Sequence, residues 1–157
     1  QNLLVSGRKI ACVGGSDYHR DRLFQILGGP CMGVYALSNA PADILDALRN
    51  GNSFIRFAPE GPSLQLISGE KMMGETQKWD ENTQVQITAS GLKTNDVLRV
   101  ITPQETTDLF QASSDGALAV TYPVKSPGFI RVEIFRTFIP GLPPLPALIS
   151  NPIYLDS

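Results

Sequence analysis

The 157-residue sequence is poor in histidine and cysteine, with one histidine and two cysteines. Two cysteines are too few for the disulfide framework of a small secreted scaffold. No apolar stretch approaches the ~20 residues that cross a membrane as a helix. Lysine and arginine are not clustered, and the formal net charge is -2. We therefore expect neither a nucleic acid nor a membrane surface as a partner.

The sequence does contain enough apolar material for a core, since 42% of its residues are hydrophobic and 18% are charged. This balance is typical of a folded globular chain and excludes a disordered one. Cys12 and Cys31 both lie among apolar neighbours, which predicts two buried free thiols. The chain starts with Gln1 and does not resemble a signal peptide. We expect it to be a piece of a longer protein that extends upstream.

Residues 8–57 alternate the patterns of strands and a helix. Three short apolar runs fit strands that are buried on both faces, as in parallel sheets; they are residues 9–13, 33–37 and 53–57. Between the last two runs, Ser38 or Asn39 can cap a helix whose first turn accepts Pro41. Gly51 follows as a stop signal. This order predicts a few β/α units.

The pattern changes from about residue 59, where short strands alternate apolar and polar residues and turn residues separate them. The predicted strands are residues 64–67, 83–90, 97–102, 118–122, 128–135 and 152–155, with a stiff proline-rich spacer at 140–146. Six or seven such strands favour a β-sandwich of immunoglobulin-like topology. We therefore expect an α+β chain with two domains, a β/α unit at 1–58 and the sandwich at 59–157.

One motif can carry chemistry: the single histidine lies in Gly14-Gly15-Ser16-Asp17-Tyr18-His19, after the first apolar run. In an extended backbone, side chains two residues apart point to the same side, so Asp17 and His19 could bind one metal ion. The end of a buried strand is also where α/β folds place their sites. The alternative is that Asp17 caps the next turn and His19 lies in solvent.

The motif resembles the last metal-binding motif of the PHP (polymerase and histidinol phosphatase) superfamily, in which a strand ends in Gly-Ser-Asp-x-His. The segment that follows, ending in Leu48-Arg49-Asn50-Gly51, resembles the close of such a domain. The sandwich is similar to the extra domain of the carbaryl hydrolase-like branch, down to its terminal Asn151-Pro152-Ile153-Tyr154. The resemblance implies that residues 1–58 are an incomplete remnant of a PHP-type barrel. It also implies that Asp17 and His19 are ligands of divalent Zn, Mn or Fe ions.

The sequence departs from that family because it has no other histidine, and two ligands fall short of the three that a catalytic zinc site usually has. We therefore expect the C-terminal fragment of a metal-dependent hydrolase of the phosphoesterase type. Such a fragment would have no catalytic residue of its own and would be inactive alone. Its expected partners are the missing upstream PHP segment, a small-molecule ester in the parent enzyme and, through open strand edges, a second copy. The alternatives are a non-catalytic sandwich that binds carbohydrate or protein, and a structural domain that shields or dimerises an enzyme.

Four other residues have weaker functional readings. Arg20 and Arg22 flank the motif and could meet an anionic substrate, but solvated side chains are the simpler reading. An exposed Trp79 indole could mark a carbohydrate-binding face, although covering the edge of the sandwich suits it better. Cys31 is better read as a packed thiol than as a site residue. The substrate and the cellular location are left open by the sequence.

Overall fold

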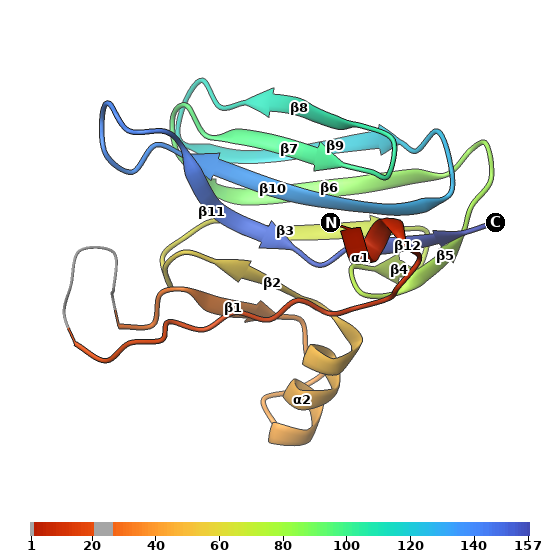
Figure 1. Ribbon diagram of the computed structural model, residues 1–157, viewed down its shortest axis with the longest axis horizontal. Helices are drawn as coiled ribbons and strands as arrows, with labels where there is room; N and C mark the ends of the chain where they lie inside the picture. The colour runs from red at the N-terminus through yellow and green to blue at the C-terminus, as the bar shows by residue number, and fades with distance from the viewer. Residues whose placement is uncertain (1, 21–26) are drawn as a thin grey trace.

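The computed structural model describes residues 2–20 and 27–157, and two mostly antiparallel β-sheets packed face to face dominate it (Figure 1). The helices are α1 (Asn2–Val5) and α2 (Pro41–Asn50). The larger sheet contains β1 (Cys31–Val34), β2 (Ser53–Arg56), β5 (Thr76–Lys78), β7 (Val97–Ile101), β8 (Thr106–Gln111), β10 (Gly128–Arg136), β11 (Leu145–Ser150) and β12 (Ile153–Asp156). The smaller sheet contains β3 (Ser63–Ser68), β4 (Lys71–Met72), β6 (Gln84–Leu92) and β9 (Gly116–Pro123).

The core lies between the facing sides of the two sheets. In β3 and β6 every second residue is buried, as expected for strands with one face on a core and one in solvent. The centre of the larger sheet is β10, which pairs with β7 along one edge and with β11 and then β12 along the other. The largest fully buried side chains include Leu64, Leu66, Ile87, Leu98, Ile130 and Ile134. The predicted strands from residue 64 onward are therefore present, although β4, β5, β8 and β11 were not expected.

The predicted fold class is wrong, because the first 58 residues do not form an incomplete β/α barrel. Strands β1 and β2 pair with each other in antiparallel fashion, and β2 then pairs antiparallel with β11. The larger sheet thus continues into the N-terminal part of the chain. The immunoglobulin-like arrangement is also not what the sheets show, since β1 and β2 extend the larger one to eight described strands. Short apolar runs fit a buried strand of either direction, so the pattern alone could not exclude the antiparallel pairing.

Helix α2 confirms the helix predicted after Pro41. It ends at Gly51, whose left-handed backbone (φ 76°) lets its N–H reach the carbonyls of Ala47 and Leu48. The expected cap is wrong: the N-cap residue is Ala40, which makes no side-chain cap hydrogen bond. Ser38 instead accepts a hydrogen bond from the Ala40 N–H (3.1 Å) and donates one to Asp43 (2.5 Å).

Helix α1 lies against the outer face of the larger sheet (Figure 1). Leu4 of α1 packs against Ile101, Phe129 and Tyr154, which form a second small apolar cluster on that face. Farther along, Cys12 is exposed and Cys31 is half-buried, so the prediction of two buried thiols is wrong. Within the described ranges, no helix is long and apolar enough to cross a membrane.

Candidate functional site

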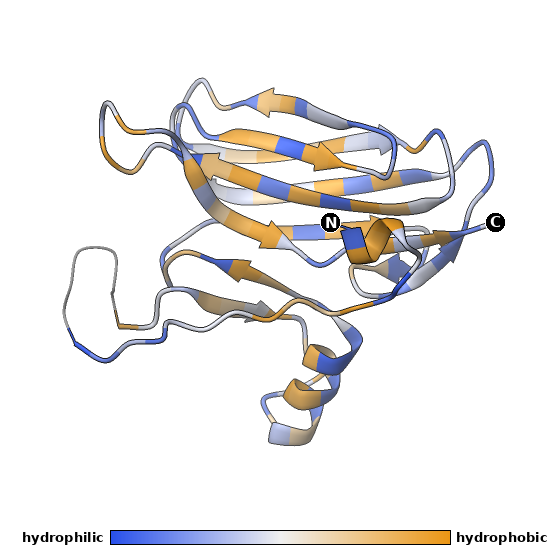
Figure 2. Cartoon of the chain, in the orientation of Figure 1, coloured by the Kyte–Doolittle hydropathy of each residue, from blue (hydrophilic) through white to orange (hydrophobic). Residues whose placement is uncertain are grey.

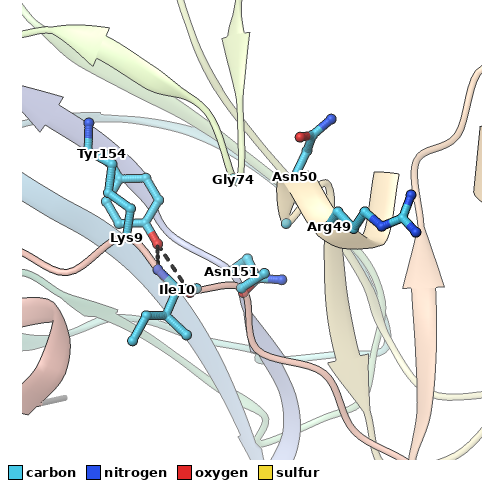
Figure 3. Close-up of a pocket in the computed structure, with 9 residues that line it drawn as sticks. Lys9, Ile10, Arg49, Asn50, Gly74, Asn151 and Tyr154 are labelled. Carbon is cyan, nitrogen blue, oxygen red and sulfur yellow. Dashed lines mark hydrogen bonds between the residues drawn. The ribbon is translucent and has the colours of Figure 1, made fainter. Parts of the chain in front are cut away.

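The site is built on residues 9–13, called the strap, which was predicted to be a buried strand and is instead an extended segment outside the sheets. Side chains from the last part of the chain hold its backbone (Figure 3). The Tyr154 hydroxyl accepts a hydrogen bond from the Ile10 N–H (2.8 Å) and donates one to the Ile10 carbonyl (3.1 Å). The Asn151 amide does the same for Cys12, at 2.6 Å to its N–H and 3.1 Å to its carbonyl.

These two side chains act as a neighbouring strand would. Ile10 and Cys12 are two residues apart, so in an extended segment their N–H and C=O groups point to the same side. Asn151 is 1% exposed, and its amide nitrogen also donates to the carbonyl and hydroxyl oxygens of Ser53, the first residue of β2. The strap is therefore tied to the larger sheet by side chains. Burial raises the pKa of the Tyr154 hydroxyl, which keeps it protonated and able to donate.

A pocket of about 210 Å³ lies between the strap, the C-terminal end of α2 and the turn at Gly74 (Figure 3). Its cationic side chains already have partners: Lys9 pairs with Asp156 (2.9 Å) and Arg49 pairs with Asp46 (3.1 Å). The Arg49 guanidinium also points away from Asn151 and Tyr154 in this view. The pocket is thus a gap beside the strap, without converging groups that would define a ligand.

After the strap, the chain passes closely over β1 and β2. The Gly14 N–H lies 3.2 Å from the Met32 sulfur, and a Cβ at Gly14 would come within 2.9 Å of the Ile55 side chain. The lack of a side chain at Gly14 therefore permits this close approach. Asp17 follows with a φ of 46°, in the left-handed region that aspartate tolerates better than most residues.

Asp17 and His19 lie side by side in this loop. The Oδ1 atom of Asp17 is 3.0 Å from the Nε2 atom of His19, and the two side chains are 87% and 78% exposed. They do not diverge to opposite sides of the chain, and Asp17 is not buried as a helix cap. They sit on an exposed loop rather than at the end of a sheet strand.

The donor set of this pair fits a divalent cation in part. A carboxylate oxygen and an imidazole nitrogen both suit zinc, manganese and iron. Two bonds of about 2.1 Å that meet at about 90° place their ligand atoms about 3.0 Å apart, so one ion could bridge the pair. Among the described residues, however, no group of three or more His, Cys, Asp or Glu side chains could hold a metal. The pair can therefore supply two ligands but cannot complete a site.

The other candidate residues lie apart from this pair or outside the described chain. Arg20 is exposed, and Arg22 falls outside the described residues. Cys31 lies in β1 and is half-buried. Trp79 packs against the main core, and its indole N–H donates to the Val124 carbonyl (3.0 Å), which supports the reading of a packed edge residue.

Sequence reasoning missed the roles of Asn151 and Tyr154. The motif Asn151-Pro152-Ile153-Tyr154 was noticed only as a point of resemblance. The sequence did contain a useful signal, which is an asparagine directly before a proline in an apolar segment. If such an asparagine is buried, both its side-chain oxygen and its NH₂ group need hydrogen-bond partners. The partner of that amide, 139 residues away at Cys12, could not be read from the sequence.

The chain matches no protein-family model, no curated protein and no solved structure.

Proposed function

We propose that this chain is the C-terminal part of a metal-dependent hydrolase of the phosphoesterase type, to which Asp17 and His19 contribute two metal ligands. The support from sequence is the resemblance of residues 14–19 to the last metal-binding motif of the PHP superfamily. In this proposal the remaining ligands come from an upstream segment. A bound divalent ion would supply an activated water and charge stabilisation for the hydrolysis of a small-molecule ester.

The main structural support for the proposal is the 3.0 Å contact between the Asp17 and His19 side chains. The segment that leads to these two residues is held against the rest of the fold. The strap is fixed at Ile10 and Cys12, and the chain at Gly14 passes tightly over Ile55. These contacts hold the chain against the larger sheet up to Gly14, three residues before Asp17. Anchoring limits the freedom that the two ligands would lose when a metal binds, which favours binding.

Exposed apolar side chains support the expected upstream partner. Seven of the nine exposed large hydrophobic residues of the described chain precede residue 58: Leu3, Val5, Ile10, Val13, Leu27, Leu37 and Leu45. Figure 2 shows apolar stretches on the N-terminal segment and on α2. An upstream segment packed on this part of the chain would remove apolar side chains from water, which favours the association.

A titration with Mn²⁺ tests the ligand assignment. Paramagnetic broadening of amide resonances should centre on Asp17 and His19, with weak affinity because two ligands hold a cation poorly. The broadening should be lost in Asp17→Asn and in His19→Gln, and kept in Asp46→Asn, which alters an exposed carboxylate on α2. Broadening that survives both substitutions, or that centres elsewhere, would refute the assignment.

Hydrolysis of p-nitrophenyl phosphate with added Mn²⁺ or Zn²⁺ tests the enzymatic part. The chain alone should not exceed the buffer rate, because its described residues hold no three-ligand group. The longer protein should be active and should lose activity on Asp17→Ala. Robust turnover by the chain alone, abolished by Asp17→Ala, would show that no upstream segment is needed. An active longer protein that tolerates Asp17→Ala would contradict the role of Asp17.

A further inference from the structure

Strand β9 is the last strand of the smaller sheet and has β6 as its one neighbour there among the described strands. It runs for eight residues, Gly116–Pro123, and none of them is charged. An edge of this kind presents a row of unpaired N–H and C=O groups, and proteins usually protect such edges with charges, prolines or very short strands.

The register of the sheet shows which backbone groups of β9 point outward. The Val124 N–H donates to the Thr83 carbonyl (3.0 Å), and this pair continues the register of β6 and β9. Hydrogen-bonded and non-bonded pairs alternate in an antiparallel ladder, so Leu118, Val120 and Tyr122 point their N–H and C=O groups toward β6. The groups of Ala117, Ala119 and Thr121 therefore face away from the sheet.

The other edges of the described sheets are better protected. Strands β4 and β5 have two and three residues, and each contains a lysine. Strand β8 contains Asp108, which is held by Arg99 of β7. Strand β1 has four residues. Strand β9 thus combines length with the absence of charge, and its one safeguard is Pro123 at its end.

We propose that β9 is the interface at which a second copy of this chain adds its own β9 in antiparallel fashion, which joins two smaller sheets into one continuous sheet. A two-fold axis through Ala119 sets Ala119 against its counterpart and Ala117 against Thr121 of the second copy. All three outward-facing residues are then hydrogen-bonded, because each bonded pair exchanges two N–H···O=C bonds.

With the two-fold axis at Ala119, the side chains of β9 can pair with those of the second copy on both faces of the sheet. On the inner face, Leu118 lies opposite Val120 of the second copy, and both are half-buried residues that pack against the core. Their pairing would extend the apolar core across the two-fold axis. On the outer face the pairs consist of alanine and threonine, which are small enough for close strands and bring no like charges together. A two-fold interface requires that one surface fits a copy of itself, and the pairs along β9 meet this requirement. We therefore assign the edge to a second copy of the chain and not to an unrelated strand.

The test is sedimentation equilibrium across about 1 µM to about 500 µM, a range that covers the affinities of weak to moderate dimers. The wild-type chain should dimerise. Ala119→Pro removes the central outward N–H and leaves the bonds to β6 intact, since proline is tolerated on an edge strand whose N–H faces solvent. Both central bonds of the dimer are lost, so the dissociation constant should rise at least about 30-fold. Ala119→Ser keeps the N–H and should still dimerise, and circular dichroism should show that both variants are folded.

Amide exchange locates the interface and keeps the test informative if Ala119→Pro does not fold. On raising the concentration, exchange at Ala117, Ala119 and Thr121 should slow, whereas Val120 should be protected throughout by its bond to β6. A wild-type chain that stays monomeric across the range would overturn the proposal. A dimer that persists in Ala119→Pro, or exchange at these three amides that ignores concentration, would also overturn it, because the contact would then use another surface.

Discussion

At the scale of single residues, Asn151 joins the two ends of the chain. It makes four hydrogen bonds, to the Cys12 N–H and carbonyl and to the Ser53 carbonyl and hydroxyl, from a position that is 1% exposed. Asn151→Ala should lower the free energy of unfolding by about 2 kcal/mol, because buried backbone groups lose their partner. Urea denaturation measures this cost.

Tyr154→Phe is the matched comparison for Asn151→Ala. It removes the bonds to Ile10 and keeps the packed ring, so it should cost about 1 kcal/mol. Amide exchange at Ile10 should then accelerate more than exchange at Cys12, and Asn151→Ala should do the reverse. Equal acceleration at both residues in both variants would mean that the strap is not held at two separate points.

The pKa of the Asp115 carboxyl depends on its hydrogen bonds with Lys93 and Thr94. Hydrogen bonds from the Lys93 ammonium and from Thr94 lower the pKa of its carboxyl to about 2. Because the folded pKa is lowered, this contact stabilises the fold fully above the ordinary value of 3.8. The contribution is lost as the pH falls from 3.8 through about 2.

Lys93→Met should raise the pKa of Asp115 back toward 3.8, since the side-chain hydrogen bond from Lys93 is the largest cause of the shift. A carboxyl-carbon NMR titration measures this directly. The Thr94 N–H is unchanged by the substitution, so a small depression should remain. An unaltered pKa in Lys93→Met would show that Thr94 alone sets it.

At the scale of elements, a tight contact fixes the end of α2 against the turn between β4 and β5. Gly74 has φ 91°, and a Cβ there would lie 2.1 Å from the Asn50 carbonyl oxygen and 2.5 Å from the Gly51 carbonyl carbon. Gly74→Ala should therefore cost about 3 kcal/mol, from left-handed strain together with overpacking against backbone atoms. Thermal denaturation checks this cost, and Gly15→Ala, where a Cβ meets nothing within 4 Å, is the control.

The loop between β6 and β7 is tied to the end of β10 by a buried ion pair. Arg136 donates to both carboxylate oxygens of Asp96, at 2.9 and 2.6 Å, and Asp96 also accepts from the Lys93 N–H. The Asp96 side chain is 1% exposed and that of Arg136 is 17% exposed. Arg136→Met should cost about 3–5 kcal/mol, because an uncompensated buried carboxylate is left behind.

A double-mutant cycle checks that account. Asp96→Asn with Arg136→Met should cost less than the sum of the two single changes, since the double variant leaves no buried charge without a partner. Additive costs would show that the two residues stabilise the loop independently.

At the scale of the whole molecule, the larger sheet carries the N-terminal part of the chain. Strand β2 pairs with β11 over Phe54, Ile55 and Arg56, so its backbone bonds depend on the sandwich. We predict that unfolding in urea is one cooperative transition. Trp79 fluorescence should report the main core beside Val124, and amide exchange in β2 should report the N-terminal part. The two should share one midpoint, and an earlier loss of β2 would contradict a single cooperative unit.

Several local features could be predicted from the amino-acid sequence alone. The alternation in residues 83–90 and 128–135 predicted β6 and β10, and Pro41 and Gly51 marked the helix between β1 and β2. Asp17 and His19 lie together as predicted, although Asp17 has φ 46° and the backbone there is not the extended one that the prediction assumed. Strands β8 and β11 were missed because polar residues in the first and prolines around the second hide the periodicity.

The other features depend on contacts between segments that are distant in the sequence. Residues 9–13 were predicted to be a buried parallel strand, yet their partners are the side chains of Asn151 and Tyr154 at the far end of the chain. The direction of β1 and β2 likewise followed from pairing with each other and with β11. An apolar run favours a strand, but Ile10 and Val13 remain exposed in the run at residues 9–13. Whether such a run joins a sheet, and beside which neighbour, depends on which distant backbone and side-chain groups remain unpaired once the rest of the chain has packed.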